Sequence, residues 1–164
     1  WTIITAGNPD SGEGKTETGA GISWNMMTAS WGGLGQLWDD DVAFIFVRPT
    51  RHTYGFLEKA KGFSLSFFSE EHRKALQICG ALSGRENDKA QVSGLTPLVF
   101  TADSHDWISY AQAEIVLGCT TIYSQDLDSS RFLDPTIMKH YPKSDYHRTY
   151  VGRIDAAWKR STAS

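Results

Sequence analysis

The sequence is poor in cysteine and in long apolar runs. Its only two cysteines, Cys79 and Cys119, are far apart, with no CxxC spacing and no nearby histidine pair. This excludes a disulfide framework and argues against a zinc site, so we expect two reduced thiols. No apolar run approaches the roughly 18 residues that span a bilayer, and no signal peptide is visible. We therefore expect a cytoplasmic protein with no membrane partner.

A basic excess is also missing from the chain. It carries 16 lysines and arginines against 19 aspartates and glutamates, which gives a formal net charge of −3 at pH 7. Proteins that bind DNA or RNA through the phosphates need a basic field over their surface. We therefore expect no nucleic-acid partner, and we treat any group of arginines as a local patch.

The usual signatures of catalysis and nucleotide binding are absent too. There is no GxGxxG after an apolar strand and no Walker A loop, which excludes the common dinucleotide and triphosphate sites. No Ser/His/Asp order, carboxylate pair or metal-ligand spacing stands out. We therefore predict no catalytic side chain and no metal site. A bound cofactor would have to carry any bond-breaking chemistry.

What the sequence does contain favours strands. Its 164 residues suit a single domain over 1–164, and its opening at Trp1, inside an apolar run and without methionine, predicts a trimmed N-terminus. Aromatic and β-branched residues in short periods favour strands over long helices. We expect strands at 1–6, 21–26, 42–47, 63–68, 98–101 and 148–158, and a run over 108–123 that bends at Gly118. The alternation over 63–68 predicts a half-buried strand.

Helices are expected only as short insertions. They are predicted at 54–60, 70–79 and 135–140, with Thr53 and Ser69 as N-caps of the first two. Six or seven strands around a few helices, without regular βα alternation, predict a mainly β fold. The expected architecture is a closed or partly closed antiparallel β-barrel with a few short helices.

Two segments point to a nucleotide ligand. The stretch 25–33 combines small polar residues, backbone donors and Trp31 with two glycines, which suits a planar heterocycle lying against the main chain. The stretch 48–53 places two guanidinium groups and two hydroxyls after an apolar strand and at an expected helix start. That combination suits a phosphate monoester. A planar ring with a phosphate is a nucleotide.

Each of these features also has a simpler explanation. Arg48 and Arg51 taken alone are typical of solvated surface charges, and Trp31 alone is typical of a core aromatic. The segment 83–89 offers Arg85 and Lys89 from a loop, but by itself it is typical of a polar connection. The residues alone therefore leave these alternatives open.

Five motifs in order carry a resemblance to a known family. They are NMMTASWGG at 25–33, VAFIFVRPTRHTYGFLE at 42–58, FSLSFF at 63–68, ALQICGALSGREN at 75–87 with DK following, and DYHRTYVGRI at 145–154. Together they resemble the flavin reductase-like, FMN-binding split-barrel family, and within it the flavoredoxin-type proteins. The match runs from Trp1 to about Ile154. It departs at the insert 8–21, which we expect to be a mobile loop that affects substrate access.

The resemblance implies an antiparallel split barrel that forms a homodimer and holds FMN near the dimer interface. It implies that the segment 25–31 is a loop along the isoalloxazine, with Asn25 at the ring's polar edge and backbone N–H groups around Thr28 to Ser30 near the ring. It also implies that cations and hydroxyls from 48–53 and 83–89 bind the phosphate. The cofactor-binding residues so assigned are Asn25, Met26, Met27, Thr28, Ala29, Ser30, Trp31, Arg48, Thr50, Arg51, Thr53, Ser83, Arg85 and Lys89.

The function expected from this resemblance is that of an FMN-dependent oxidoreductase. NAD(P)H would reduce the bound FMN, which would pass electrons to a second acceptor. One alternative is a flavoredoxin-type electron carrier that is reduced by a partner protein. Another is a non-catalytic barrel. The sequence also leaves open whether Arg51 and His52 serve a nicotinamide's 2′-phosphate rather than the phosphate of FMN.

The residues themselves favour a homodimer as well. The run 42–47 is apolar at every position, whereas a small barrel fills its interior with alternate residues only. The outward residues of this strand need cover, and a second copy of the chain is the simplest source.

Overall fold

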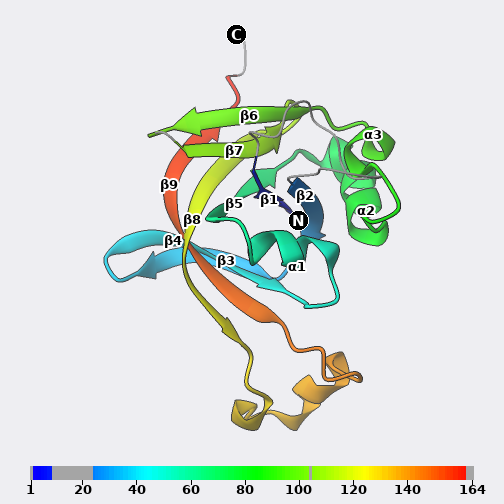
Figure 1. Cartoon of the computed structure of the whole chain (residues 1–164), viewed down its shortest axis with the longest axis vertical. Coiled ribbons are helices and arrows are strands. Elements are labelled where there is room, and N and C mark those ends of the chain that lie inside the picture. Colours follow the sequence, from blue (N-terminus) through cyan, green and yellow to red (C-terminus); the bar gives the residue numbers. More distant parts are fainter. Residues whose placement is uncertain (1, 9–23, 104, 162–164) are drawn as a thin grey trace.

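The computed structural model describes residues 2–8, 24–103 and 105–161 (Figure 1). It is mainly β, as expected, with a seven-stranded antiparallel sheet of order β2-β1-β5-β8-β9-β4-β3 and a two-stranded sheet β6-β7. The strands are β1 (Thr2–Gly7), β2 (Trp24–Ala29), β3 (Gly32–Leu37), β4 (Asp40–Val47), β5 (Gly62–Phe67), β6 (Pro97–Ala102), β7 (His105–Tyr110), β8 (Ile115–Asp126) and β9 (Arg148–Lys159). The expected insert at 8–21 falls almost wholly outside the described residues.

The helices are short. They are α1 (His52–Leu57), α2 (Arg73–Ala81) and α3 (Lys89–Ser93), with 3-10 turns at Glu70–His72, Ser129–Arg131 and Pro135–His140. In the described part of the chain, no helix is long and apolar enough to cross a membrane. Both cysteines are buried and unpaired, as expected of reduced thiols.

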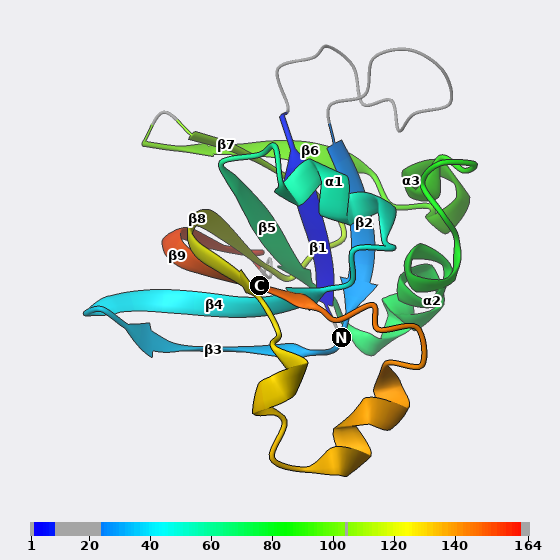
Figure 2. The ribbon, with the colours of Figure 1, turned by 60° about the horizontal axis from the view of Figure 1, so that its bottom comes forward.

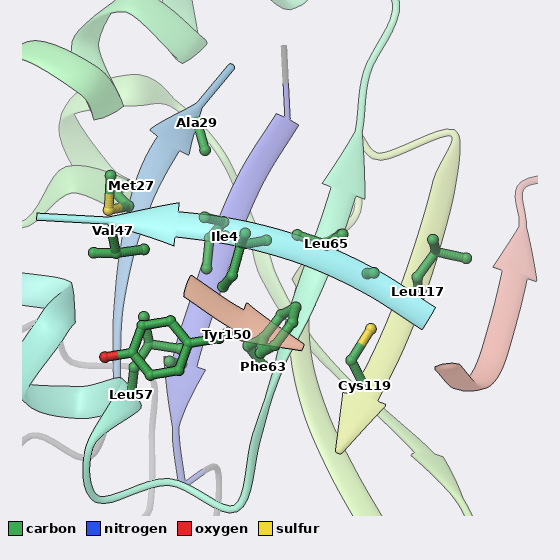
Figure 3. Close-up of a cluster of buried hydrophobic side chains, with 13 residues drawn as sticks. Ile4, Met27, Ala29, Val47, Leu57, Phe63, Leu65, Leu117, Cys119 and Tyr150 are labelled. Carbon is green, nitrogen blue, oxygen red and sulfur yellow. The ribbon is translucent and has the colours of Figure 1, made fainter. Parts of the chain in front are cut away.

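The large sheet curls around one apolar core without closing. Met27 of β2 and Val47 of β4 come from strands near opposite ends of the sheet order, yet they share this core (Figure 3). Phe63 of β5 and Cys119 of β8 lie in the same cluster, at 1% and 0% exposure. The sheet therefore forms a barrel that is split between β2 and the β3–β4 hairpin.

The strand β5 is buried on both faces, so the expectation of a half-buried strand is wrong. Its polar face carries Ser64 and Ser66, which are 1% and 0% exposed. Ser64 donates to the Ile108 carbonyl, and the hydroxyls of Ser66 and Ser109 are 2.7 Å apart. The sheet β6-β7 thus covers this face and provides hydrogen-bond partners for its hydroxyls, so their burial does not leave unsatisfied polar groups.

The expectation of one continuous, bent strand over 108–123 is also wrong, because the chain forms two strands there. β7 ends at Tyr110 and β8 begins at Ile115. The bend expected at Gly118 is present as a register shift between Gly118 and Cys119. A Cβ atom on Gly118 would lie 2.6 Å from the Trp107 ring, so the close approach of β7 to β8 requires glycine here.

Beyond the barrel, β8 and β9 continue as a two-stranded ribbon that carries the segment 127–147 (Figure 1, bottom). We call this segment the arm. It projects away from the barrel and contains two of the 3-10 turns (Figure 2). The expected helix at 135–140 is therefore present, in 3-10 form.

Three other expectations need correction. Helix α1 begins at His52 with Arg51 as its N-cap, so Thr53 lies inside the helix rather than capping it. The helix expected at 70–79 is a 3-10 turn followed by α2, which continues to Ala81, and Ser69 makes no side-chain cap bond. Residues 21–23 of the strand expected at 21–26 lie outside the described residues; the described part belongs to β2, which begins at Trp24 and runs on to Ala29.

Candidate flavin site

The segment expected to line a planar ring is a strand, not a loop. Residues 25–29 belong to β2, and in the described part of the chain β2 pairs with β1 alone. Helices α1 and α2 both pack against β2. The Thr28 hydroxyl donates to the Leu76 carbonyl of α2, which ties the strand to that helix. The second edge of β2 therefore has no strand partner among the described residues, although the two helices leave only Thr28 of this strand partly exposed.

Asn25 is the centre of a small buried cluster. Its Nδ2 donates to Thr53 Oγ1 over 2.9 Å, and both side chains are almost fully buried. A Cβ atom on Gly84 would lie 2.2 Å from Asn25 Oδ1, so the loop that follows α2 approaches this amide closely. Ser83 turns that loop by accepting from the Arg85 backbone N–H. The structure thus brings together three segments that are far apart in sequence.

Two cations of the expected phosphate site meet at the C-terminal end of α2. Arg51 Nη2 donates to the Gly80 carbonyl over 2.8 Å, and Lys89 Nζ donates to the Cys79 carbonyl over 3.0 Å. Neither makes an ion pair with a carboxylate among the described residues. Burial, together with the charge of Arg51, lowers the pKa of Lys89 to about 8. Two positive charges without a negative partner favour an anion at this point.

Arg48 lies elsewhere. Its guanidinium pairs with Asp145 over 2.7 Å, donates to the His140 carbonyl over 2.7 Å and stands 5.1 Å from the centre of the Tyr141 ring. All three partners belong to the arm. Thr50 is exposed in the turn between Arg48 and the helix. The structure therefore brings Arg51 and Lys89 together and directs Arg48 to the base of the arm.

Trp31 follows β2 by two residues and is 45% exposed. Its ring centre lies 4.7 Å from that of His147 and 5.6 Å from that of His140. His147 is buried, and its Nδ1 lies 2.8 Å from the Tyr141 hydroxyl. Burial, with the charge of Arg48 adding to it, lowers the pKa of His147 to about 4, so the ring is neutral at pH 7. The arm thus supports Trp31 through the ring of His140 and the neutral ring of His147.

The sequence did not indicate the contacts of the arm with this site. Asp145, Tyr141 and His147 hold Arg48 and Trp31, but they lie about 100 residues away along the chain. The quoted motif at 145–154 contained Asp145 and His147, and it was the only signal that could have pointed to them. A second feature that the sequence did not indicate is a cleft of about 850 Å³ that Arg51 and Arg85 share with other residues.

A comparison with protein families decides the identity of the domain. The flavin reductase-like domain matches residues 1–164, the whole chain. The chain belongs to this family. A comparison of the flavin reductase-like domain with curated proteins finds no significant match.

Solved structures resemble this flavin reductase-like domain over nearly its whole length. An FMN-binding protein from Thermus thermophilus is 21% identical with a TM-score of 0.66, and the match covers 96% of this chain and 68% of that one. Flavoredoxin of Desulfovibrio vulgaris is 16% identical with a TM-score of 0.68, covering 98% and 69%. An NADH:FAD oxidoreductase of Streptomyces globisporus is 14% identical with a TM-score of 0.64, covering 97% and 74%. At these identities the likeness shows the split-barrel fold.

Proposed function

We propose that the protein binds FMN and acts as an oxidoreductase that takes electrons from NAD(P)H and passes them to a second acceptor. One observation carries the flavin part of this proposal. The second edge of β2 has no strand partner among the described residues, and a Cβ atom on Gly80, whose carbonyl accepts from Arg51, would lie 3.4 Å from Thr28 of β2. Arg51 and Lys89 have no carboxylate partner among the described residues. The first feature suits the polar edge of a planar ring and the second suits a terminal phosphate.

The residues present fit FMN. Main-chain groups of β2 would bond the pyrimidine edge of the ring, with Asn25 fixed by Thr53 at one end of the strand. Arg51 and Lys89 would hold the phosphate. Arg85 lies in the loop between α2 and α3, shortly before Lys89. Arg48 would act indirectly, because its contacts are with the arm. Trp31 would pack near the ring.

The bound flavin would supply the electron-transfer chemistry. The chain's own residues bind the flavin, fix its orientation and exclude water from one of its faces. We assign no general acid or base. Because His147 is neutral, it adds no positive charge beside Trp31. The cations Arg51 and Lys89 lie together at the end of α2, where a phosphate would bind.

We also propose that the protein is a homodimer. The strand β3 is exposed along most of its length, and Leu34 and Trp38 of the β3–β4 hairpin are 57% and 61% exposed. Outward-facing Phe44 and Phe46 of β4 are only half-buried. Covering these residues with a second copy would form an interface on the order of 2,000 Å² in total, which is typical of obligate dimers. Light scattering at micromolar concentration should report a dimer, and a monomer that retains FMN would contradict this proposal.

Two measurements test the redox role. The protein should take up FMN and show a flavin absorbance spectrum, whereas a colourless protein that fails to bind added FMN would favour the non-catalytic barrel. Rapid mixing of the FMN-loaded protein with NADH or NADPH under anaerobic conditions should bleach the flavin absorbance. Bound FMN that neither nucleotide bleaches would favour the electron carrier reduced by a partner protein, a role consistent with the likeness to flavoredoxin.

A further inference from the structure

A cleft of about 850 Å³ lies at one end of the barrel. Helix α1, the end of β1 and the beginnings of β5 and β7 surround it, and Figure 2 shows these elements meeting there. Small-molecule sites usually have volumes of roughly 300 to 1,000 Å³. The cleft is therefore large enough for a ligand of nucleotide size.

The charged residues of this cleft are nearly all basic. Arg51, Lys59, Lys61 and Arg85 line it, and Asp106 is the only carboxylate among its described lining residues. Lys59, Lys61 and Arg85 make no ion pair within the described part of the chain. Four guanidinium and ammonium groups around one cavity attract a phosphate-bearing ligand.

Aromatic side chains complete the lining. The half-buried Phe56 and Tyr54 come from α1, whereas Trp107 of β7 is almost fully buried, at 6% exposure. Phe56 is held edge-to-face against His52, with ring centres 5.1 Å apart. Rings of this kind stack on planar heterocycles. The cleft thus combines phosphate-binding groups with the two partly exposed rings of α1, which can stack on a base.

The cleft is distinct from the ring-binding edge of β2. None of residues 24–31 and neither Arg48 nor Lys89 lines it, but Arg51 and Arg85 do. It therefore begins at cations of the expected flavin phosphate site and continues along α1 to Lys59 and Lys61. We infer that this cleft is a second site, for a nucleoside 5′-phosphate group, adjoining the flavin phosphate.

This site does not depend on the redox role, so its test uses binding alone. Calorimetry should show that 5′-AMP binds the FMN-loaded protein without releasing FMN, and that adenosine and inorganic phosphate bind more weakly than AMP. The Lys59→Ala/Lys61→Ala variant should lose roughly tenfold in AMP affinity, and added salt should shrink that loss. A matched Lys74→Ala/Lys139→Ala variant, with two exposed lysines outside the cleft, should bind AMP normally.

Two further titrations identify the molecule that carries the nucleotide. If the site serves the adenylate half of FAD, apoprotein should bind FAD more tightly than FMN, and the Lys59→Ala/Lys61→Ala variant should remove that difference. If it serves a nicotinamide dinucleotide, the same variant should weaken NADH or NADPH binding and leave both flavins unchanged. AMP that displaces FMN one for one, AMP binding that both lysine variants retain equally, or no AMP binding at millimolar concentration would each overturn the inference.

Discussion

Arg48 and Arg51 are three residues apart, yet their surroundings differ in kind. Arg48 is neutralised by Asp145 and enclosed by the arm. Arg51 donates to a helix carbonyl, next to a second cation, with no carboxylate partner among the described residues. A cation that the fold has already paired serves the structure, whereas a cation paired only with carbonyl oxygens is ready for an anionic ligand. The comparison separates a structural arginine from a candidate ligand-binding one.

The largest effect is expected from removing both cations at the end of α2. Arg51→Ala/Lys89→Ala should weaken FMN binding by at least about a hundredfold, because each charge-assisted contact contributes roughly 1.5 to 3 kcal/mol. Riboflavin, which lacks the phosphate, should bind nearly as well as to the parent. Arg48→Ala is the matched control and should change FMN affinity far less. Titration by quenching of flavin fluorescence measures all three, and equal losses for FMN and riboflavin would show that Arg51 and Lys89 do not hold the phosphate.

Stability at alkaline pH tests Lys89 in the absence of any ligand. Its pKa in the folded protein is about 8, below its ordinary value of 10.5, so the unfolded chain binds more protons between these two values. Below pH 8 the folded protein bears the full cost of burying a charged lysine, so the free energy of unfolding should rise with pH over this window, by roughly 3 kcal/mol. Denaturant unfolding of Lys89→Met should lack this rise. Saturating FMN should also reduce it, because a phosphate favours the charged lysine.

Stability at acid pH tests the role of Arg48, because the charge of Arg48 helps to lower the pKa of His147. The pKa of this histidine is about 4 in the folded protein, below its ordinary value of 6.5, so the unfolded chain binds more protons between these values. The free energy of unfolding should fall by roughly 3 kcal/mol as the pH drops through this window. His147→Asn should reduce the fall. Arg48→Ala should reduce it in part, because the charge of Arg48 contributes to the lowered pKa; an unchanged acid profile in both variants would contradict the role assigned to the arm.

The smallest effect concerns Trp31. Since this ring lies beside the end of β2, FMN binding should quench its fluorescence. Trp31→Phe should therefore show a smaller quenching amplitude than the parent, over the background of the five other tryptophans. An equal amplitude in the two proteins would place Trp31 away from the flavin.

Much of the fold could be predicted because burial leaves a local pattern. The apolar run 42–47 and the alternation over 63–68 both mark strands at nearly the observed bounds. Strand β3 was missed because it is glycine-rich and exposed, so neither apolar periodicity nor β-branched residues mark it. The loop expected at 25–31 was wrong over 25–29, because small polar residues there are compatible with an edge strand as well as with a loop.

The candidate site was less predictable because its decisive contacts are not local. Nothing in the sequence around Arg48 shows that Asp145, 97 residues later, neutralises it. The burial of Lys89 and its proximity to Arg51 depend in the same way on how α2 and α3 pack. Sequence patterns identify which residues can bind a phosphate, whereas tertiary packing decides which of them are left unpaired to do so.

The second edge of β2, which has no strand partner among the described residues, has a consequence for how the protein stays soluble. Unpaired main-chain donors and acceptors along a strand are a template on which another polypeptide can add a strand, and this is how many proteins begin to aggregate. Here α1 and α2 pack against β2, and five of its six residues are buried. Undocking of either helix would expose an edge on which a second chain could add a strand, so solubility would depend on how firmly α1 and α2 stay docked.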